Sequence, residues 1–329
     1  MGDYLKITII TPSYNQGEYL EQTIDSVLSQ GYPNLEYLVM DGGSTDGSVE
    51  IIKKYEKHLS YWESRKDAGQ SDAINKGIRR ASGEIINWLN SDDYYQPGAL
   101  FKVAKAFNDP KVRLYSGRSN IVDGAGKWIR SSSGTDIYSG NLAKTIGQAR
   151  IDQPETFYRS SAVYKIGLLN THLQYVMDKD WWIKYLLIFG LGGIRIGKDA
   201  LVNFRFHGQS KSSMHQNSFE IETNTLYYHL CESNGLTKYK DIITSTGINP
   251  HLDISYTQHN EADLIIQYYL LYKADRAYYL GDHKLSQNFL AHIHPQSLSP
   301  EDRSLYHKLK LRSKLIPGWL RKAAKSLYA

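Results

Sequence analysis

Strand-like and helix-like segments alternate over roughly the first 115 residues of the chain. Apolar runs typical of strands occupy residues 7–10, 35–40 and 85–89, and apolar residues recur at helical spacing in 20–28 and 73–78. Parallel strands need crossover connections of this kind, and the crossovers are usually helices. The order therefore predicts an α/β fold with a mainly parallel, twisted sheet covered by helices.

The composition is that of a soluble globular protein, with 41% hydrophobic and 22% charged residues in 329. No apolar run approaches the ~20 residues that span a bilayer, and the N-terminus has no signal-peptide pattern. Cys231 is the single cysteine, so an intramolecular disulfide is excluded. We therefore expect a cytoplasmic protein.

The sequence changes character after the strand–helix alternation. Residues 121–129 indicate a β-hairpin with Asp-Gly at its turn. After about residue 215 the pattern is helical and Tyr-rich, with one helix expected near 261–279 and a second near 284–292. We predict a first domain over residues 1–214 and a helical accessory region over 215–329.

The segment 303–329 carries eight basic residues and no acidic residue, interleaved with leucines and a tryptophan. Such a segment suits an anionic membrane surface, which would place the protein on the inner face of the cell membrane. The alternative is a terminal segment that packs on the protein with a solvated basic face. No nucleic-acid-binding motif accompanies the charge, so we expect no nucleic-acid partner.

Carboxylates stand just past two of the predicted strands. Asp92 and Asp93 follow residues 85–89, and Asp41 follows 35–40. Ligands of such sheets bind beyond the carboxyl ends of the strands, so these side chains should converge on one crevice. Adjacent carboxylates repel each other unless a cation or hydrogen bonds compensate, and Mg²⁺ sites combine one or two carboxylates with substrate phosphates. A metal–diphosphate site is therefore predicted, with a simple turn as the alternative.

Three motifs, each after a strand, carry a family resemblance: Thr-Pro-Ser-Tyr-Asn at 11–15, Asp-Gly-Gly-Ser-Thr-Asp-Gly-Ser at 41–48, and Asn-Ser-Asp-Asp at 90–93. Together they resemble family 2 glycosyltransferases, which have the GT-A fold, over roughly residues 5–210. The resemblance implies a GT-A-type sheet, here followed by a C-terminal helical region, and a UDP-sugar donor.

The resemblance also implies the contacts of the donor. From the residues alone, a fixed carboxylate such as Asp41 could accept a hydrogen bond from the uracil ring, and a purely structural role in the Gly-rich turn is its alternative. The residues assigned to the nucleotide-sugar are Thr11, Pro12, Tyr14, Asp41, Asp67, Gln70, Asn90, Ser91, Asp92 and Arg205.

A Mg²⁺ or Mn²⁺ cofactor is expected at the diphosphate. Asp92 is the leading ligand, Asp93 the second, and His207 could bind the metal or a phosphate. Asn90 departs from the family pattern, because it stands where an Asp-any-Asp motif has its first carboxylate. An amide oxygen is a weaker ligand, so this departure bears on metal dependence.

The resemblance also implies that residues 177–184 contribute to the acceptor side of the site. Asp178 matches the catalytic base of the family and Asp180 is the fallback, since residues two apart on a helix point in different directions. Trp181 and Trp182 could form an aromatic wall for an acceptor sugar; a helix cap at Asp178 and core tryptophans are the alternative. Glu155 lies in a further family-like stretch near the acceptor, with a structural role as its alternative.

We therefore predict an inverting, metal-dependent hexosyl- or N-acetylhexosaminyltransferase. It would move a sugar from a UDP-sugar to a hydroxyl of a saccharide acceptor, lipid-linked in our preferred version, in bacterial-type surface polysaccharide assembly. The alternatives are a non-catalytic nucleotide-sugar-binding protein and a nucleotidyltransferase. A dinucleotide-binding dehydrogenase is disfavoured, because no Gly-x-Gly-x-x-Gly turn follows the first strand.

Overall fold

The computed structural model describes residues 4–208 and 211–315 of the chain. Within them, contacts define two compact units. The sheet unit comprises the chain up to residue 137 together with 150–220, and the helical unit comprises 138–149 together with the chain from 221 onward. The segment 138–149 thus groups with the helical unit, whereas the domain boundary at 214 and 215 stays a prediction. No helix among the described residues is both long and apolar enough to cross a lipid bilayer.

The sheet unit is built on a nine-stranded sheet with the order β3-β2-β1-β4-β8-β6-β9-β5, and β7 pairs with β6. The first four strands in this order are parallel, whereas β8 is antiparallel to both of its neighbours. The strands are β1 (Ile7–Ser13), β2 (Leu35–Asp41), β3 (Tyr61–Ser64), β4 (Ile85–Trp88), β5 (Tyr94–Tyr95), β6 (Leu114–Val122), β7 (Trp128–Ser131), β8 (Thr156–Arg159) and β9 (Ile194–Arg205).

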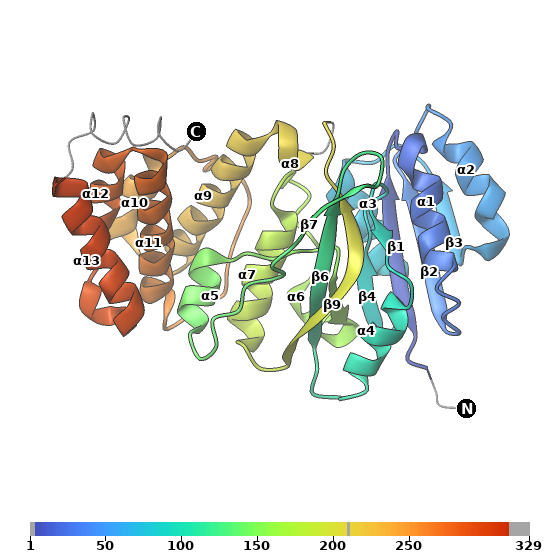
Figure 1. Cartoon of the computed structure of the whole chain (residues 1–329), viewed down its shortest axis with the longest axis horizontal. Coiled ribbons are helices and arrows are strands. Elements are labelled where there is room, and N and C mark those ends of the chain that lie inside the picture. The colour runs from blue at the N-terminus through green and yellow to red at the C-terminus, as the bar shows by residue number, and fades with distance from the viewer. Residues whose placement is uncertain (1–3, 209–210, 316–329) are drawn as a thin grey trace. The chain divides into compact units, whose positions relative to one another are not determined.

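Helices cover this sheet. Helix α3 packs on β1 and β2, α4 packs on β6 and β9, and α6 packs on β4 and β8 (Figure 1). Strand β1 is buried along its whole length, as expected for a strand covered on both faces. The helices of this unit are α1 (Gly17–Leu28), α2 (Ser48–Tyr55), α3 (Gln70–Arg80), α4 (Ala99–Phe107), α6 (Ser160–Ile166), α7 (Met177–Phe189) and α8 (Lys211–Met214).

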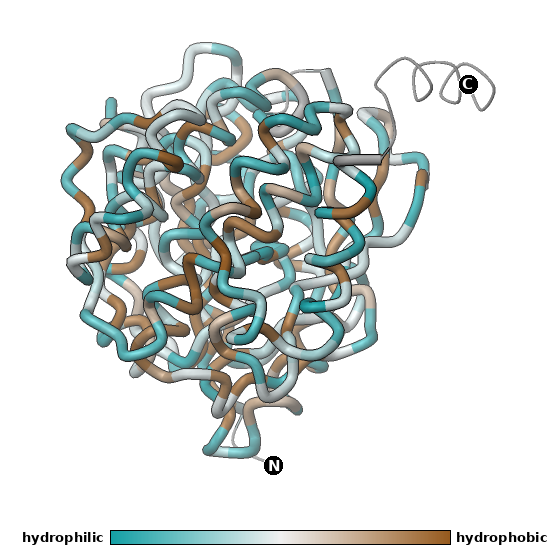
Figure 2. Tube along the Cα trace, turned by 90° about the vertical axis from the view of Figure 1, so that its left-hand side faces the viewer, coloured by the Kyte–Doolittle hydropathy of each residue, from teal (hydrophilic) through white to brown (hydrophobic). Residues whose placement is uncertain are grey.

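The helical unit contains α5 (Leu142–Gln148), α10 (Lys240–Thr244), α11 (Ala262–Leu280), α12 (His283–Ala291) and α13 (Pro300–Leu315), and α9 (Gln216–Ser233) passes from one unit into the other. Helix α5 packs closely on α11, since a Cβ on Gly147 would lie 2.6 Å from the Cβ of Tyr268. Hydrophobic and hydrophilic residues alternate along the helices, as expected for helices with one buried face (Figure 2). The predicted pair of helices near 261–279 and 284–292 is present as α11 and α12.

One contact in the sheet unit predicts a stability effect. A Cβ on Gly77 of α3 would lie 2.5 Å from Cγ2 of Ile10, which is fully buried in β1. Gly77→Ala should therefore lower the free energy of unfolding by about 1–3 kcal/mol through overpacking, less the ~1 kcal/mol by which alanine favours a helix. Urea denaturation measures the change.

The matched control is Gly192→Ala, where the added Cβ would meet only the Phe189 carbonyl oxygen, at 3.9 Å. An unfolding midpoint for Gly77→Ala above that of Gly192→Ala would contradict the close packing of α3 on β1.

Candidate active site

The first side of the site forms where β1 and β2 end. These strands are parallel and in register, with Ser13 beside Asp41, so the segments that follow them leave the sheet at the same edge. Thr11 and Pro12 are buried within β1, and the Thr11 hydroxyl lies 3.1 Å from that of Tyr37. Tyr14, one residue past the strand, is 62% exposed. Of the three predicted nucleotide-sugar residues in this segment, Thr11, Pro12 and Tyr14, only Tyr14 presents its side chain to solvent.

Asp41 is buried and holds the turn that follows β2. Its carboxylate accepts hydrogen bonds from the backbone N–H groups of Gly43 and Ser44, at 3.0 and 2.9 Å, and from the Ser64 hydroxyl at 2.6 Å. The Ser44 hydroxyl donates a fourth bond. This is the structural role considered from the sequence, and contact with the uracil ring stays a prediction.

Asp67 and Gln70 lie on either side of the start of α3. A Cβ on Gly42 would come within 2.8 Å of Asp67 Oδ2, which shows that Asp67 packs directly on the turn after β2. Gln70 Nε2 donates to Asn90 Oδ1 at 2.8 Å, and Lys211 Nζ donates to Gln70 Oε1 at 3.0 Å. The amide at position 90 is thus engaged with Gln70, a contact that links two motifs far apart in sequence.

Residues 90–93 form a turn that is held from two directions. The Thr23 hydroxyl of α1 lies 2.9 Å from the Ser91 carbonyl oxygen and 2.7 Å from that of Asp93. From β9, the Arg205 backbone N–H donates to Asp93 Oδ1 at 2.9 Å. Both Ser91 and Asp93 are buried. Thr23 was missed in the sequence, because a threonine inside a helix carries no signal of a distant partner.

Arg205, which was assigned to the nucleotide-sugar, makes its contacts inside the protein. It is only 3% exposed, and its guanidinium donates to the carbonyl oxygens of Asp92 and Gly124 at 2.9 and 2.7 Å. The rings of Tyr19 and Tyr94 lie 4.7 and 5.3 Å from it. Because its donors are used inside the protein, the guanidinium positions the 90–93 turn in this structure.

The fit of a divalent cation can be tested at Asp92 and His207. Asp92 Oδ2 lies 3.2 Å from His207 Nε2, and the carboxylate remains partly exposed. The described residues contain no group of three His, Cys, Asp or Glu side chains arranged to hold a metal. A carboxylate and an imidazole are suitable donors, and Mg²⁺-type sites take further ligands from substrate phosphates. The pair therefore fits a cation that is shared with a diphosphate.

Asp93 differs from its neighbour. It is 1% exposed, and its Oδ2 atom has no hydrogen-bond partner. Burial, reinforced by the charge of Asp92, raises its pKa well above the usual range. Asp93 is therefore more buried than Asp92, and its role as second metal ligand stays a prediction.

The predicted base Asp178 lies in the first turn of α7, and Val176 rather than Asp178 precedes the helix as its cap residue. Its Oδ1 accepts a hydrogen bond from the Lys179 backbone N–H at 2.8 Å. Burial raises the pKa of Asp178 to about 6, a value suited to a general base near neutral pH. Asp180, by contrast, is fully buried and pairs with Lys184 at 2.7 Å. The two carboxylates thus occupy different environments.

The two tryptophans of α7 are not an exposed wall. Trp181 is 1% exposed, packs against Trp88 and Tyr158, and donates its indole N–H to the Gly167 carbonyl oxygen. Trp182 is fully buried. Both side chains fill the core of the sheet unit, the alternative considered from the sequence, because α7 is enclosed on more than one side.

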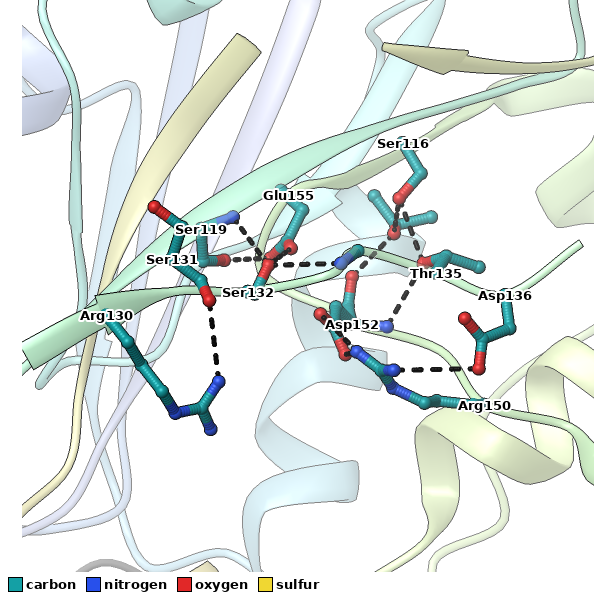
Figure 3. Close-up of polar contacts among 12 residues, drawn as sticks. Ser116, Ser119, Arg130, Ser131, Ser132, Thr135, Asp136, Arg150, Asp152 and Glu155 are labelled. Atoms are coloured by element: carbon teal, nitrogen blue, oxygen red, sulfur yellow. Dashed lines mark hydrogen bonds and ion pairs between the residues drawn. The ribbon is translucent and has the colours of Figure 1, made fainter. Parts of the chain in front are cut away.

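Glu155 is fully buried beside β6, directly before β8, and the hydroxyls of Ser119 and Ser132 donate to its carboxylate (Figure 3). Burial, with the charge of Asp152 adding to it, raises the pKa of Glu155 to about 8. This placement is structural, and direct contact with an acceptor stays a prediction. Beside it, Arg150 pairs with Asp152 and lies 3.5 Å from Asp136.

Solved structures similar to this chain have a GT-A-like fold, which confirms the predicted fold class. S. aureus TarS, residues 1–349, in complex with UDP-GlcNAc, superposes with a TM-score of 0.56 at 19% identity, covering 94% of this chain and 88% of TarS 1–349. The model of glycosyl transferase family 2 matches residues 8–167. The predicted resemblance to glycosyltransferase family 2 is thus confirmed over residues 8–167, just under half of the chain.

Curated relatives agree with the family. An uncharacterized glycosyltransferase of Rickettsia felis is 28% identical over 237 residues, which are 69% of this chain and 39% of the relative. One from Nostoc is 29% identical over 213 residues, or 62% of this chain and 66% of the relative. The match thus spans well under half of the Rickettsia felis relative.

Proposed function

We propose that the protein is an inverting glycosyltransferase that moves a sugar from a UDP-sugar to a hydroxyl of a saccharide acceptor. The observation that carries the proposal is the Asp92–His207 pair, 3.2 Å apart, in which the carboxylate of Asp92 is partly exposed and the imidazole of His207 is largely buried, beyond the carboxyl end of the parallel strand β4. This is where α/β sheets bind ligands. The UDP-GlcNAc complex of TarS supports a UDP-sugar as the donor class.

The chain supplies groups for each part of a single displacement. Asp178 takes the proton of the acceptor hydroxyl as its oxygen bonds to the anomeric carbon, and the bond from that carbon to the diphosphate oxygen breaks. Asp92 and His207 would hold a Mg²⁺ or Mn²⁺ ion, which neutralises the charge of the departing diphosphate. Arg205 and Thr23 keep the 90–93 turn in place while this occurs.

The pKa of Asp178 predicts how activity depends on pH. A base must be deprotonated to act, so kcat/KM should fall about tenfold per pH unit below the pKa of about 6. Initial rates of UDP release between pH 4.5 and 8 measure this decrease in kcat/KM. Tm values over the same range test whether unfolding causes it. A rate that is flat down to pH 4.5 would contradict Asp178 as the base.

We propose that the acceptor is a lipid-linked saccharide. We also propose that the protein is cytoplasmic and binds the membrane surface. The described part of the basic segment, 303–315, lies in α13, where Tyr306 and Leu309 are buried while Leu311 is 59% exposed. Residues 316–329, the rest of this basic segment, lie outside the described residues. Deleting 316–329 should reduce binding to anionic liposomes; unchanged binding would remove the membrane from the proposal.

A thermal-shift screen of nucleotide-sugars with and without Mn²⁺ tests the proposed donor, because a ligand that binds the folded state raises Tm. We expect UDP-sugars to raise Tm, with a larger rise when Mn²⁺ is present. No shift with any UDP-sugar would overturn the donor class. Release of pyrophosphate instead of UDP would favour a nucleotidyltransferase, and binding without release of either would favour a non-catalytic binding protein.

A further inference from the structure

Trp128 is exposed at the first position of β7. It is 60% exposed, and all four residues of β7 face solvent. Tryptophan is usually highly buried, and the side chain here meets none of the aromatic or cationic partners found around other rings of the described chain. Among the described residues Trp128 is the one tryptophan that counts as exposed. An exposed aromatic ring is normal when it stands alone, so its position relative to the candidate site decides whether it binds a ligand.

The sheet register places Trp128 two strands away from Arg205, which donates a hydrogen bond to the Asp92 carbonyl oxygen. Val122 of β6 lies opposite Trp128 on one side and opposite Arg205 of β9 on the other. Residues directly opposite each other share a face of the sheet. At ~4.8 Å between strands, the Cα atom of Trp128 lies about 10 Å from that of Arg205.

An irregularity in the hairpin determines which side chain takes this place. The pairing of β6 with β7 shifts between Ile121 and Val122, so Trp128 rather than Ile129 lies opposite Val122. Bulges at sheet edges commonly re-aim a side chain next to an active site. The extra residue in β7 therefore turns Trp128 toward the face that carries Val122.

The hairpin that bears Trp128 is fastened to the site. The Gly124 carbonyl oxygen accepts a hydrogen bond from Arg205 Nη1 at 2.7 Å. A Cβ on Gly124 would lie 3.6 Å from the His207 Cβ. The same Arg205 donates to the Asp92 carbonyl oxygen. The turn of the hairpin and the Asp92–His207 pair thus share one support.

The other end of β7 leads toward the acceptor side. Beyond Ser131 the chain passes Ser132, which contacts Glu155, and reaches Thr135, whose hydroxyl accepts a hydrogen bond from the Asp152 backbone N–H at 3.1 Å (Figure 3). The charge of Asp152 is close enough to Asp178 to contribute to its raised pKa. The segment 128–135 therefore runs from the strand position opposite Val122 to the surroundings of Glu155 and Asp152, on the predicted acceptor side.

We propose that Trp128 is a stacking platform for a pyranose ring of the saccharide acceptor. The indole offers a broad, rigid apolar face that matches the C–H face of a sugar ring. Its exposed edge strand leaves room for a chain of sugars, which the buried Trp181 and Trp182 do not. Trp128 is thus an acceptor-binding residue with no part in the chemical step, and the assignment rests on the proposed transferase function.

Direct binding is tested by ¹⁹F NMR on the full chain labelled with 5-fluorotryptophan, in which Trp128→Phe identifies the Trp128 resonance. The probes are β-linked gluco- and galacto-oligosaccharides and chito-oligosaccharides. We expect at least one of them to move the Trp128 resonance in a saturable way, and to leave those of Trp181 and Trp182 in place. A Trp128 resonance that none of these probes moves overturns the proposal. This result does not depend on turnover.

Kinetics supply the second readout, with the saccharide that moves the Trp128 resonance as acceptor. Trp128→Ala should raise the KM for this acceptor by roughly 10- to 100-fold, with the KM for the UDP-sugar unchanged, and Trp128→Phe should recover most of the loss. Tyr164→Ala is the control, since Tyr164 is 65% exposed and far from the site. It lies on α6, which begins near Ile85 at the start of β4, whereas the site lies beyond the end of β4. An unchanged acceptor KM, or a donor KM that rises equally, overturns the platform. Absence of UDP release from the unmodified protein would instead count against the proposed function.

Discussion

Asp178→Asn should lower the turnover of sugar transfer by roughly 10²- to 10⁴-fold, the range expected when a general base is removed. The variant should fold normally. Burial already disfavours the charged form of Asp178, and the asparagine Oδ1 can keep the hydrogen bond from Lys179. UDP-sugars should still raise its Tm, because the change lies on the acceptor side. Steady-state rates and thermal shifts on the same preparation measure both effects.

The matched control is Asp180→Asn, the same substitution two residues along the same helix. Asp180 is fully buried against Lys184, so losing its charge leaves a partly buried cation unpaired and should lower Tm. Its folded fraction should nevertheless turn over at nearly the normal rate. The reverse pattern, with Asp178→Asn active and Asp180→Asn folded but inactive, would transfer the role of base to Asp180.

Asp92→Ala should abolish the extra Tm rise that Mn²⁺ gives in the presence of UDP, and should lower turnover by about 10²-fold or more. The substitution removes one of the two side chains that would bind the cation, so the charge of the leaving diphosphate is no longer offset. Stability should change little, since the carboxylate is partly exposed and its described hydrogen bond is to His207 alone. His207→Ala should reproduce the metal effect, more weakly because the carboxylate remains.

Asp199→Asn serves as the control for Asp92. Asp199 is an exposed carboxylate that also pairs with a single side chain, Lys102 at 3.1 Å. It should keep both turnover and the Mn²⁺-dependent shift. A Mn²⁺-dependent shift that survives in Asp92→Ala would show that the cation binds elsewhere or only to the nucleotide.

The parallel half of the sheet could be predicted from the sequence because its signals are local. The segments that became β1, β2 and β4 are short apolar runs that end in turn residues, and the helices between them show regular apolar spacing. The three motifs lie at the ends of these strands, so their convergence followed from the parallel order alone. The hairpin at 121–129 was equally local, since Asp-Gly marks its turn.

The environment of individual side chains could not be predicted in this way. Trp181 shares a helical face with Asp178, yet only the folded chain brings Trp88 and Tyr158 against it. Arg205 suits a phosphate as well as the carbonyl oxygens that it meets, and no pattern distinguishes the two. The sequence did contain a signal for the exposure of Trp128. Lys127 precedes it and β7 ends in polar residues, and such polar neighbours indicate an exposed strand.

The excursion of the chain through α5 limits how the protein can be divided. The chain leaves the sheet unit after residue 137 and returns at 150, and at this point Arg150 accepts a backbone hydrogen bond from Asp136. A fragment cut at residue 214 would carry α5 without α11, which leaves the apolar side of α5 around Ile146 in water and favours aggregation. Because the two ends of the segment 138–149 lie close together, a short linker in its place should yield a fragment of the sheet unit that aggregates less.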